Sequence, residues 1–148
     1  MLLDVPLHRQ ERPWSCLAAC VRIRLEFHGS LVDEAEVIRA CGGSPLGLNL
    51  EDTALGLHLL GFDSTILHRP DAAFVQEQLA IEQPVIVSLS FGQIANRTLR
   101  HAVVVIGWSP SQVCIVDPTD GARSSLGADH FLEYWEAGGG RGMVIFPR

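Results

Sequence analysis

Basic residues are scarce in this chain. Its 148 residues include only 11 lysines and arginines, scattered along the sequence, against 17 aspartates and glutamates, and the formal net charge is −6. A protein that follows nucleic-acid phosphates needs positive charge concentrated on one surface. The composition therefore argues against a nucleic-acid-binding protein.

Long hydrophobic runs are also missing. The longest fully apolar stretch covers residues 102–108, whereas a helix that crosses a bilayer needs about 20 such residues. The N-terminal segment MLLDVPLHRQ has no cationic region and contains Asp4 and Pro6, which is not typical of a signal peptide. We therefore expect a cytoplasmic protein with no direct membrane insertion.

Cysteines are few and irregularly spaced. Four occur, with no CxxC pair, which argues against a disulfide framework and against a structural zinc site: Cys16, Cys20, Cys41 and Cys114. The histidines outside the candidate site form no metal-ligand pattern such as HExxH: His8, His28, His58, His68 and His130. We expect a reduced protein that needs neither a metal nor a cofactor.

Apolar residues make up 47% of the chain, enough for a core in one domain covering residues 1–148. Apolar stripes between capping residues and glycines predict helices over residues 16–28, 33–41, 49–60 and 71–80, and a short one near 129–136. Ser15 is the expected N-cap of the first helix. Apolar or β-branched runs predict strands over residues 62–67, 84–89, 101–108, 113–117 and 143–146. Helices before strands indicate an α+β fold with an antiparallel sheet.

Cys16 is the residue around which chemistry is expected. An isolated cysteine is often only a small buried hydrophobe. Here it begins a predicted helix, whose free N–H groups favour a thiolate. His101 and Asp117 each lie at the end of a predicted strand, and Gln10 lies just upstream. A thiol, an imidazole, a carboxylate and an amide donor are the parts of an acyl-transfer site.

The hairpin between the predicted strands decides whether His101 and Asp117 meet. If its turn centres on Pro110, Asp117 lies opposite Val103, which shares a face of the sheet with His101. A register shifted by one residue would place the carboxylate on the opposite face. A Cys–His–Asp triad therefore predicts a turn with an odd number of residues.

The sequence resembles the double-glycine leader peptidases, a family of papain-like, bacteriocin-processing domains usually fused to ABC exporters. The resemblance covers nearly the whole chain. It starts with the six-residue step from Gln10 to Cys16 and continues through Cys20. It then follows FHG at residues 27–29, GGSPLGLNLEDTALGLHLLGF at 42–62, HAVVVIGW at 101–108 and VDPTDG at 116–121. Phe131 and Trp135 before a last strand complete it.

The resemblance implies a papain-like α+β fold in which the nucleophile helix packs on an antiparallel sheet. It implies that Cys16 is the nucleophile, His101 the general base and acid, and Asp117 the residue that orients the imidazole. Gln10 and the backbone N–H of Cys16 would form the oxyanion hole. The implied substrate is a leader peptide cut after Gly-Gly. The implied partner is an ABC transporter on another chain, which would use the ATP and hold the protein at the inner face of the membrane.

Two departures from the family pattern flank the nucleophile. Ser15 precedes Cys16 where the family commonly has Asp or Glu, and Leu17 follows it where Gly or Ala is common. A bulky Leu17 could narrow the site or change the substrate.

Two other functions use the same residues. Some relatives have lost catalysis and only dock peptides for an exporter, and the same triad could transfer an acyl group to an amine rather than to water. Degenerate docking domains typically lose the cysteine, so the presence of Cys16, His101, Asp117 and Gln10 favours an enzyme.

Several neighbouring features have structural explanations. Cys20, Cys41 and Cys114 are expected to be buried, with Cys20 in the core rather than acting as a second reactive thiol. Gly42 and Gly43 resemble the end of a double-glycine leader but are better explained as a helix C-terminus. Trp14 could equally line a substrate groove or cover the start of the first helix.

Overall fold

Three helices open the chain, and strands dominate the rest. The computed structural model describes residues 2–94 and 97–148. The helices are α1 (Cys16–Phe27), α2 (Glu34–Cys41), α3 (Leu50–Leu59), α4 (Ala72–Ala80) and α5 (Ala128–Ala137). The strands are β1 (Phe62–His68), β2 (Val85–Ile94), β3 (Arg97–Trp108), β4 (Gln112–Asp117), β5 (Ala122–Gly127) and β6 (Arg141–Pro147).

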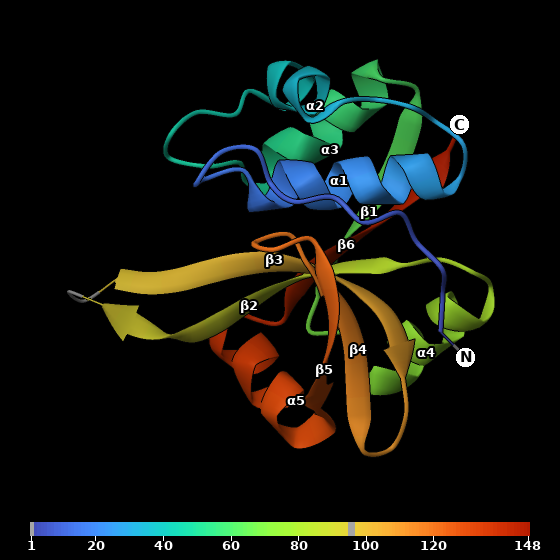
Figure 1. Ribbon diagram of the computed structural model, residues 1–148, viewed down its shortest axis with the longest axis vertical. Coiled ribbons are helices and arrows are strands. Elements are labelled where there is room, and N and C mark those ends of the chain that lie inside the picture. Colours follow the sequence, from blue (N-terminus) through green and yellow to red (C-terminus); the bar gives the residue numbers. More distant parts are fainter. Residues whose placement is uncertain (1, 95–96) are drawn as a thin grey trace.

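The strands form one six-stranded antiparallel sheet in the order β1-β6-β2-β3-β4-β5. Helices α1, α2 and α3 gather on one side of the central strands, and α4 and α5 lie on the other (Figure 1). Helix α1 rests against β3, and α5 rests against β2. The predicted α+β class with an antiparallel sheet is confirmed.

Local sequence explains most helix boundaries. The side chains of Asp33, Asn49 and Asp71 each accept a hydrogen bond from the backbone N–H three residues ahead, at the starts of α2, α3 and α4. Helix α2 ends at Gly42, which has a φ of 72° in the left-handed region. The prediction that Gly42 ends a helix is confirmed.

Ser15 occupies the N-cap position of α1, but its side chain does not cap the helix. Its hydroxyl instead accepts a hydrogen bond from the N–H of Arg12 at 3.0 Å and lies 3.2 Å from a carboxylate oxygen of Glu34. The prediction of a side-chain cap at Ser15 is wrong, because this hydroxyl holds the preceding loop instead.

Strand β5 was not predicted. Its sequence, ARSSLG, is polar, and almost all of its residues are exposed because it forms one edge of the sheet. Neither β-branched residues nor an alternation of apolar and polar residues marks it. Pairing with β4 is what makes this segment a strand.

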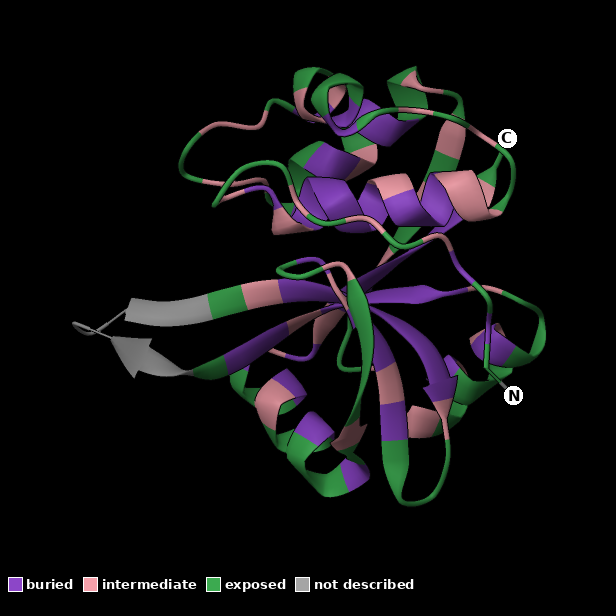
Figure 2. Cartoon of the chain, viewed as in Figure 1, coloured by how far each residue is buried: buried purple, intermediate pink, exposed green. Residues whose placement is uncertain are grey.

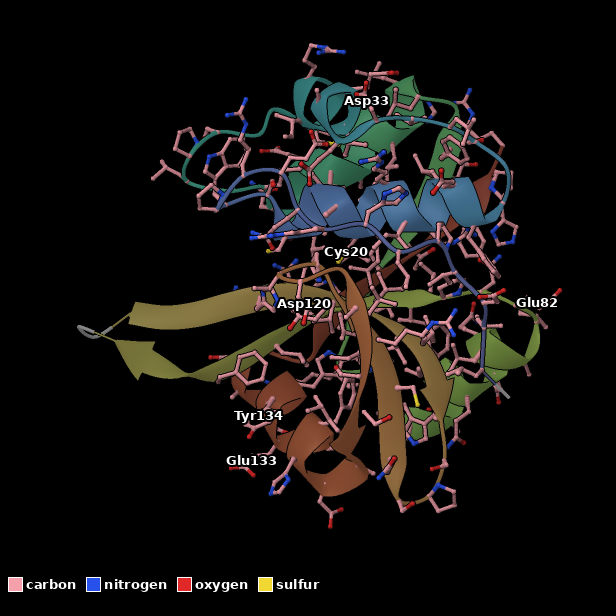
Figure 3. The ribbon with its side chains drawn as sticks, viewed as in Figure 1. Cys20, Asp33, Glu82, Asp120, Glu133 and Tyr134 are labelled. Atoms are coloured by element: carbon pink, nitrogen blue, oxygen red, sulfur yellow. The ribbon has the colours of Figure 1, made fainter. Side chains whose placement is uncertain are left out.

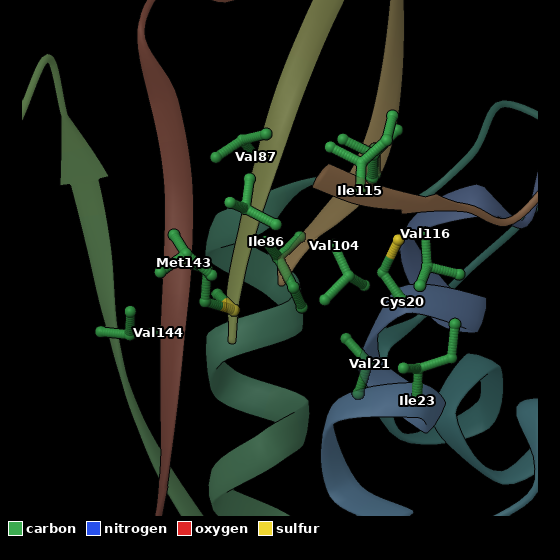
Figure 4. Packing of buried hydrophobic residues seen from close by; sticks show 14 of the residues in the cluster. Cys20, Val21, Ile23, Ile86, Val87, Val104, Ile115, Val116, Met143 and Val144 are labelled. Carbon is green, nitrogen blue, oxygen red and sulfur yellow. The ribbon is translucent and has the colours of Figure 1, made fainter. Parts of the chain in front are cut away.

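The core lies mainly between α1 and the sheet. Most of α1 is buried, as its two apolar stripes predicted (Figure 2). Cys20, Val21 and Ile23 face the buried valines of β3 and β4, Val104 and Val116 (Figure 4). This packing fixes α1, and hence its first residue, over β3.

The cysteines differ from one another in burial, and all four are free. Cys20 is completely buried and Cys41 is 3% exposed, so both predictions are confirmed. The prediction that Cys114 is buried is wrong. It is only partly covered and contacts Ser125 on the edge strand β5, with 3.3 Å between the sulfur and the hydroxyl oxygen.

Within residues 2–94 and 97–148, no helix combines the length and the apolar character needed to cross a membrane.

Candidate active site

Cys16 and His101 meet where α1 begins above β3. Each of the two side chains shifts the pKa of the other, and the backbone groups of Leu17 and Ala102 also lower the pKa of the Cys16 thiol. Both residues line a cleft of about 1000 Å³, which we call the Cys16 cleft. The predicted nucleophile and base thus lie together at the surface of this cleft.

Asp117 approaches His101 from the end of β4. Its Oδ1 lies 2.6 Å from His101 Nε2, and both side chains are partly exposed. The structure therefore brings Cys16, His101 and Asp117 together, with Asp117 bonded to the imidazole that shares the cleft with Cys16.

The hairpin that joins β3 and β4 has an even turn. Trp108 pairs with Val113, and the N–H of Ser109 donates to the carbonyl of Gln112 at 2.8 Å. The predicted odd-length turn is therefore wrong. By itself, an even turn would send the Asp117 side chain to the face opposite His101.

A β-bulge at Ile106 corrects the register. This residue has no partner on β4, and the pairs on either side of it are Gly107–Cys114 and Val105–Ile115, followed by Val104–Val116. One extra residue on β3 shifts the pairing by one position. Continuing that register places Asp117 opposite Val103, on the face that carries His101.

The pKa values of Cys16 and His101 are shifted in opposite directions from those of free side chains. Burial acts to raise the pKa of the Cys16 thiol, but the hydrogen bond with His101, the backbone hydrogen bonds and the charge of the imidazolium together hold this pKa below its usual value. Burial acts to lower the pKa of His101, but Cys16 and Asp117 raise it to about 9. Both shifts favour the form in which Cys16 is a thiolate and His101 an imidazolium.

Asp117 stays ionised beside this pair. Burial would raise the pKa of its carboxyl group, but hydrogen bonds with His101 and with the backbone N–H of Thr119 keep it below the ordinary value. The carboxylate therefore holds the imidazolium by charge as well as by geometry.

Gln10 also lines the Cys16 cleft, but its amide is occupied. Its Nε2 donates to the carbonyl of Arg12 at 2.8 Å and to that of Pro13 at 3.2 Å. Its Oε1 is buried and has no hydrogen-bond partner among the described residues. In this conformation the Gln10 side chain holds the loop before Cys16. One of its N–H groups must leave its carbonyl acceptor before it can donate to an oxyanion.

Glu34 holds the same loop from α2, and sequence reasoning missed it. Its side chain is only 1% exposed, and it accepts the N–H of Glu11 at 2.8 Å. The hydroxyl of Ser15 lies against its other oxygen. Burial raises the pKa of Glu34, and these hydrogen bonds partly offset that rise. Only the fold brings Glu34 to the loop, so no local signal could have found it.

Thr119 is a second residue that the sequence analysis did not assign. Its N–H donates to Asp117 Oδ1 at 2.9 Å, and its hydroxyl lies 3.1 Å from His101 Nε2. An aspartate that accepts the N–H two residues ahead is a known turn motif. The sequence DPTDG therefore carried a signal for this contact.

The turn that carries Asp117 and Thr119 rests on the segment that carries Gln10. The N–H of Gln10 donates to the carbonyl of Pro118 at 2.7 Å. Gly121, with a φ of 68°, packs so closely that a Cβ there would lie 2.7 Å from the nitrogen of Arg9. The turn that carries Asp117 and the segment that carries Gln10 are thus in direct backbone contact.

Two further residues define the walls of the cleft. Leu17 is buried and lines both the Cys16 cleft and a smaller cavity of about 150 Å³ beside it. Trp14 lines the Cys16 cleft, which favours the groove alternative for this residue. Among the described residues, no group of three or more His, Cys, Asp or Glu side chains could hold a metal ion.

Known structures share this fold. The peptidase domain of Streptococcus ComA, a bifunctional ABC transporter of a quorum-sensing pathway, is 20% identical with a TM-score of 0.80, covering 98% of this chain and 100% of that one. A double-glycine-motif protease from an AMS/PCAT transporter, solved with its leader peptide, is 22% identical with a TM-score of 0.76, covering 99% and 94%. A C39-like peptidase from Bacillus anthracis is 15% identical with a TM-score of 0.78, covering 99% and 98%.

Sequence comparison gives the family. Among curated proteins, no sequence matches this chain significantly. The sequence model of the Peptidase C39 family, in contrast, matches residues 4–140, which is most of the chain. This protein is therefore a member of the peptidase C39 family.

Proposed function

We propose that the protein is a cysteine peptidase that cuts a leader peptide after a Gly-Gly pair. The observation that carries the proposal is that Cys16 and His101 line one cleft, with Asp117 bonded to His101 and with the pKa of Cys16 lowered and that of His101 raised. These shifts favour a thiolate beside an imidazolium, which is the reactive form of a cysteine nucleophile. Membership of the C39 family supports peptide-bond hydrolysis. The related double-glycine-motif protease with its leader peptide supports the substrate class.

In the proposed reaction, the Cys16 thiolate attacks the carbonyl carbon of the second glycine. The electron pair of that carbonyl moves to its oxygen, which the backbone N–H of Cys16 and the amide of Gln10 stabilise. Gln10 would release its longer hydrogen bond, the one to Pro13 at 3.2 Å, to do so.

His101 then completes both halves of the reaction. Its Nε2–H is held by Asp117, so Nδ1 is left to face Cys16 and to protonate the leaving amine. The C–N bond breaks and a thioester remains on Cys16. His101 next takes a proton from water, which hydrolyses the thioester and regenerates the thiolate.

The proposed partner is an ABC transporter, because the similar structures include peptidase domains of such transporters. A transporter would place the protein at the inner face of the membrane and would use ATP itself. Copurification of this chain with a transporter encoded beside it tests the proposal.

The decisive experiment uses a peptide that contains one Gly-Gly pair, with mass spectrometry of the products. We expect cleavage after the second glycine by the natural protein and by Cys20→Ser, and none by Cys16→Ser. A parallel series with Gly, Ala or Leu at the two positions before the cut should show cleavage falling with side-chain size. Equal cleavage of all three peptides would contradict the leader-peptidase proposal.

The same assay separates the two alternatives. A peptide-docking domain would bind the Gly-Gly peptide and leave it intact. An acyltransferase would give an amide rather than a free carboxylate when an amine is added. Incorporation of ¹⁸O from labelled water into the new C-terminus is the result expected for a peptidase.

A further inference from the structure

Nearly every described arginine outside the Cys16 cleft has a side-chain partner. The chain contains no lysine, so arginines supply all its basic side chains apart from the histidines. Ion pairs join Arg22 to Glu11, Arg69 to Glu136, Arg123 to Asp4 and Arg141 to Glu51. Arg24 is buried among hydrogen-bond acceptors, and Arg148 contacts His58. The surface arginines are thus largely neutralised by acids of this acidic chain.

Three arginines of the Cys16 cleft differ from these. Arg9, Arg12 and Arg100 line the cleft, are exposed, and have no side-chain hydrogen bond or ion pair with the side chains described, those of residues 2–91 and 100–148. Arg9 and Arg12 flank Gln10, and Arg100 directly precedes His101. The positive charges therefore come from both segments that carry proposed catalytic residues.

Acidic groups do not balance this charge inside the cleft. Glu11 is the single carboxylate among the residues that line it, and its Oε2 lies 3.5 Å from Arg22. Asp117 lies behind His101 and is engaged with it. Three unpaired guanidinium groups around one cleft repel one another, and an anionic ligand would remove that repulsion.

We propose that the Cys16 cleft selects peptides with acidic side chains close to the scissile bond. Guanidinium groups bind carboxylates through two parallel hydrogen bonds, which gives both attraction and orientation. The net charge of −6 repels an anionic peptide at long range, so the selection must come from contacts within the cleft. The inference rests on the proposed peptidase function and adds a charge preference to it.

The test uses pairs of Gly-Gly peptides that differ only by Glu or Gln at one position. The position is moved step by step along both sides of the cut, and kcat/KM is measured for each pair. At one or more positions we expect kcat/KM for the Glu peptide to exceed that for the Gln peptide. The expected ratio is about two- to fivefold for each arginine that the glutamate contacts, the range of an exposed ion pair. The preference should shrink as salt is raised toward 1 M.

Arginine variants identify the source of the preference. Arg9→Gln, Arg12→Gln or Arg100→Gln should each reduce the preference at particular positions, and the triple variant should abolish it. Arg39→Gln is the matched control, because Arg39 is also exposed and unpaired among the described residues but does not line the Cys16 cleft. It should leave the Glu-to-Gln ratio unchanged.

A binding measurement separates this inference from the proposed function. Fluorescein-labelled Glu and Gln peptides are titrated with the Cys16→Ser variant, and anisotropy gives Kd without any cleavage. If the natural protein cuts no peptide, the peptidase proposal fails, whereas tighter binding of the Glu peptide still supports the charge preference. Equal binding of Glu and Gln peptides at every position would overturn it. A preference that survives in the triple variant, or disappears equally in Arg39→Gln, would also overturn it.

Discussion

Cys16 differs from the other three cysteines in what surrounds its sulfur. It begins a helix and contacts an imidazolium, and both favour its thiolate. Cys20 lies one turn further along the same helix, where burial raises the pKa of its thiol well above the usual value (Figure 3). Burial likewise raises the pKa of Cys41 to about 11. Two thiols one turn apart on one helix thus have pKa values shifted in opposite directions.

We predict that iodoacetamide modifies Cys16 about tenfold faster than any other cysteine of the folded protein near pH 7. The thiolate is the reacting species, and an ordinary thiol is mostly protonated at this pH. Peptide mapping after timed alkylation measures the four rates. Cys114 is the internal control, because it is partly exposed like Cys16 but has no imidazole partner among the described residues.

His101→Ala should remove most of the difference in alkylation rate, since the helix end alone contributes only about 0.3–1 kcal/mol when exposed. Asp117→Asn should weaken the difference without removing it. If Cys16 and Cys114 react equally fast in the natural protein, the activation of Cys16 is absent and the docking function becomes the better proposal.

Gln10 offers a second prediction for a single residue. Gln10→Ala should lower kcat by about 100- to 1000-fold, the usual effect of losing one oxyanion donor, with little change in KM. Steady-state kinetics on a Gly-Gly peptide measures both constants. Gln112→Ala, an exposed glutamine on β4, is the control and should behave as the natural protein does.

A different outcome for Gln10→Ala would assign this residue another task. A rise in KM together with a lower unfolding temperature would mean that Gln10 only shapes the loop through Arg12 and Pro13. Unchanged kinetics would remove Gln10 from the mechanism altogether.

At the scale of elements, the helices and the sheet differ in how far the sequence predicted them. Asp33, Asn49 and Asp71 predicted three helix starts because a cap is a contact between residues close in sequence. Strand β5 and the bulge at Ile106 were not predicted, because each exists only through pairing with β4. Sequence predicted that the strands over residues 101–108 and 113–117 form a hairpin, but not the count of residues that sets their register.

The same distinction applies to the candidate site. The chemical types and order of Cys16, His101 and Asp117 suggested that they would meet, and the structure brings them together. Glu34 could not be anticipated, because its contacts with the loop before Cys16 depend on how α2 packs against that loop. The engagement of the Gln10 amide by Arg12 and Pro13 depends on the fold of that loop in the same way.

Packing between α2 and α3 gives a prediction about stability. Gly56→Ala would normally stabilise a helix by about 1 kcal/mol. In α3, however, the added Cβ would lie 2.6 Å from both the Ala40 carbonyl oxygen and the Cys41 sulfur, so the helices must separate. We expect a net loss of about 1–3 kcal/mol in the free energy of unfolding, measured by urea denaturation.

Leu55→Ala is the matched control for this substitution. Leu55 lies in the same helix but is 70% exposed, so its replacement should change the stability by less than about 0.5 kcal/mol. An increase in stability for Gly56→Ala would show that helix propensity outweighs the contact with α2.

On the scale of the whole molecule, the site joins two layers. Cys16 comes from the helical layer, and His101 and Asp117 come from the sheet (Figure 1). The Cys16 cleft lies where these layers meet. The pKa values of Cys16 and His101 therefore depend on how the helical layer is aligned with the sheet.

The pH dependence of activity follows from this pair. As pH rises through the lowered pKa of Cys16, the thiolate forms and kcat/KM should increase. The raised pKa of His101 means that the imidazolium persists until about pH 9, above which its proton is lost and kcat/KM should fall. A profile measured from pH 4 to 10.5 on a Gly-Gly peptide tests both limbs.

Asp117→Asn should move the alkaline limb to lower pH, because the carboxylate helps to raise the pKa of His101. Asp120→Asn is the control, since it removes the same charge from the same turn at a residue that bonds to Ala122 instead. An alkaline limb that stays in place in Asp117→Asn would mean that His101 is not the group that titrates there.

The contact between Gly121 and the backbone of His8 and Arg9 has a consequence for how this protein can diverge. No L-side chain fits between those backbones, whatever its chemistry, so that spacing is fixed independently of the substrate. The side chains of Arg9 and Arg12 project from the same segment and are exposed. Substitutions can therefore change which peptides enter while the catalytic groups keep their alignment, so that specificity and catalysis can evolve separately within one loop.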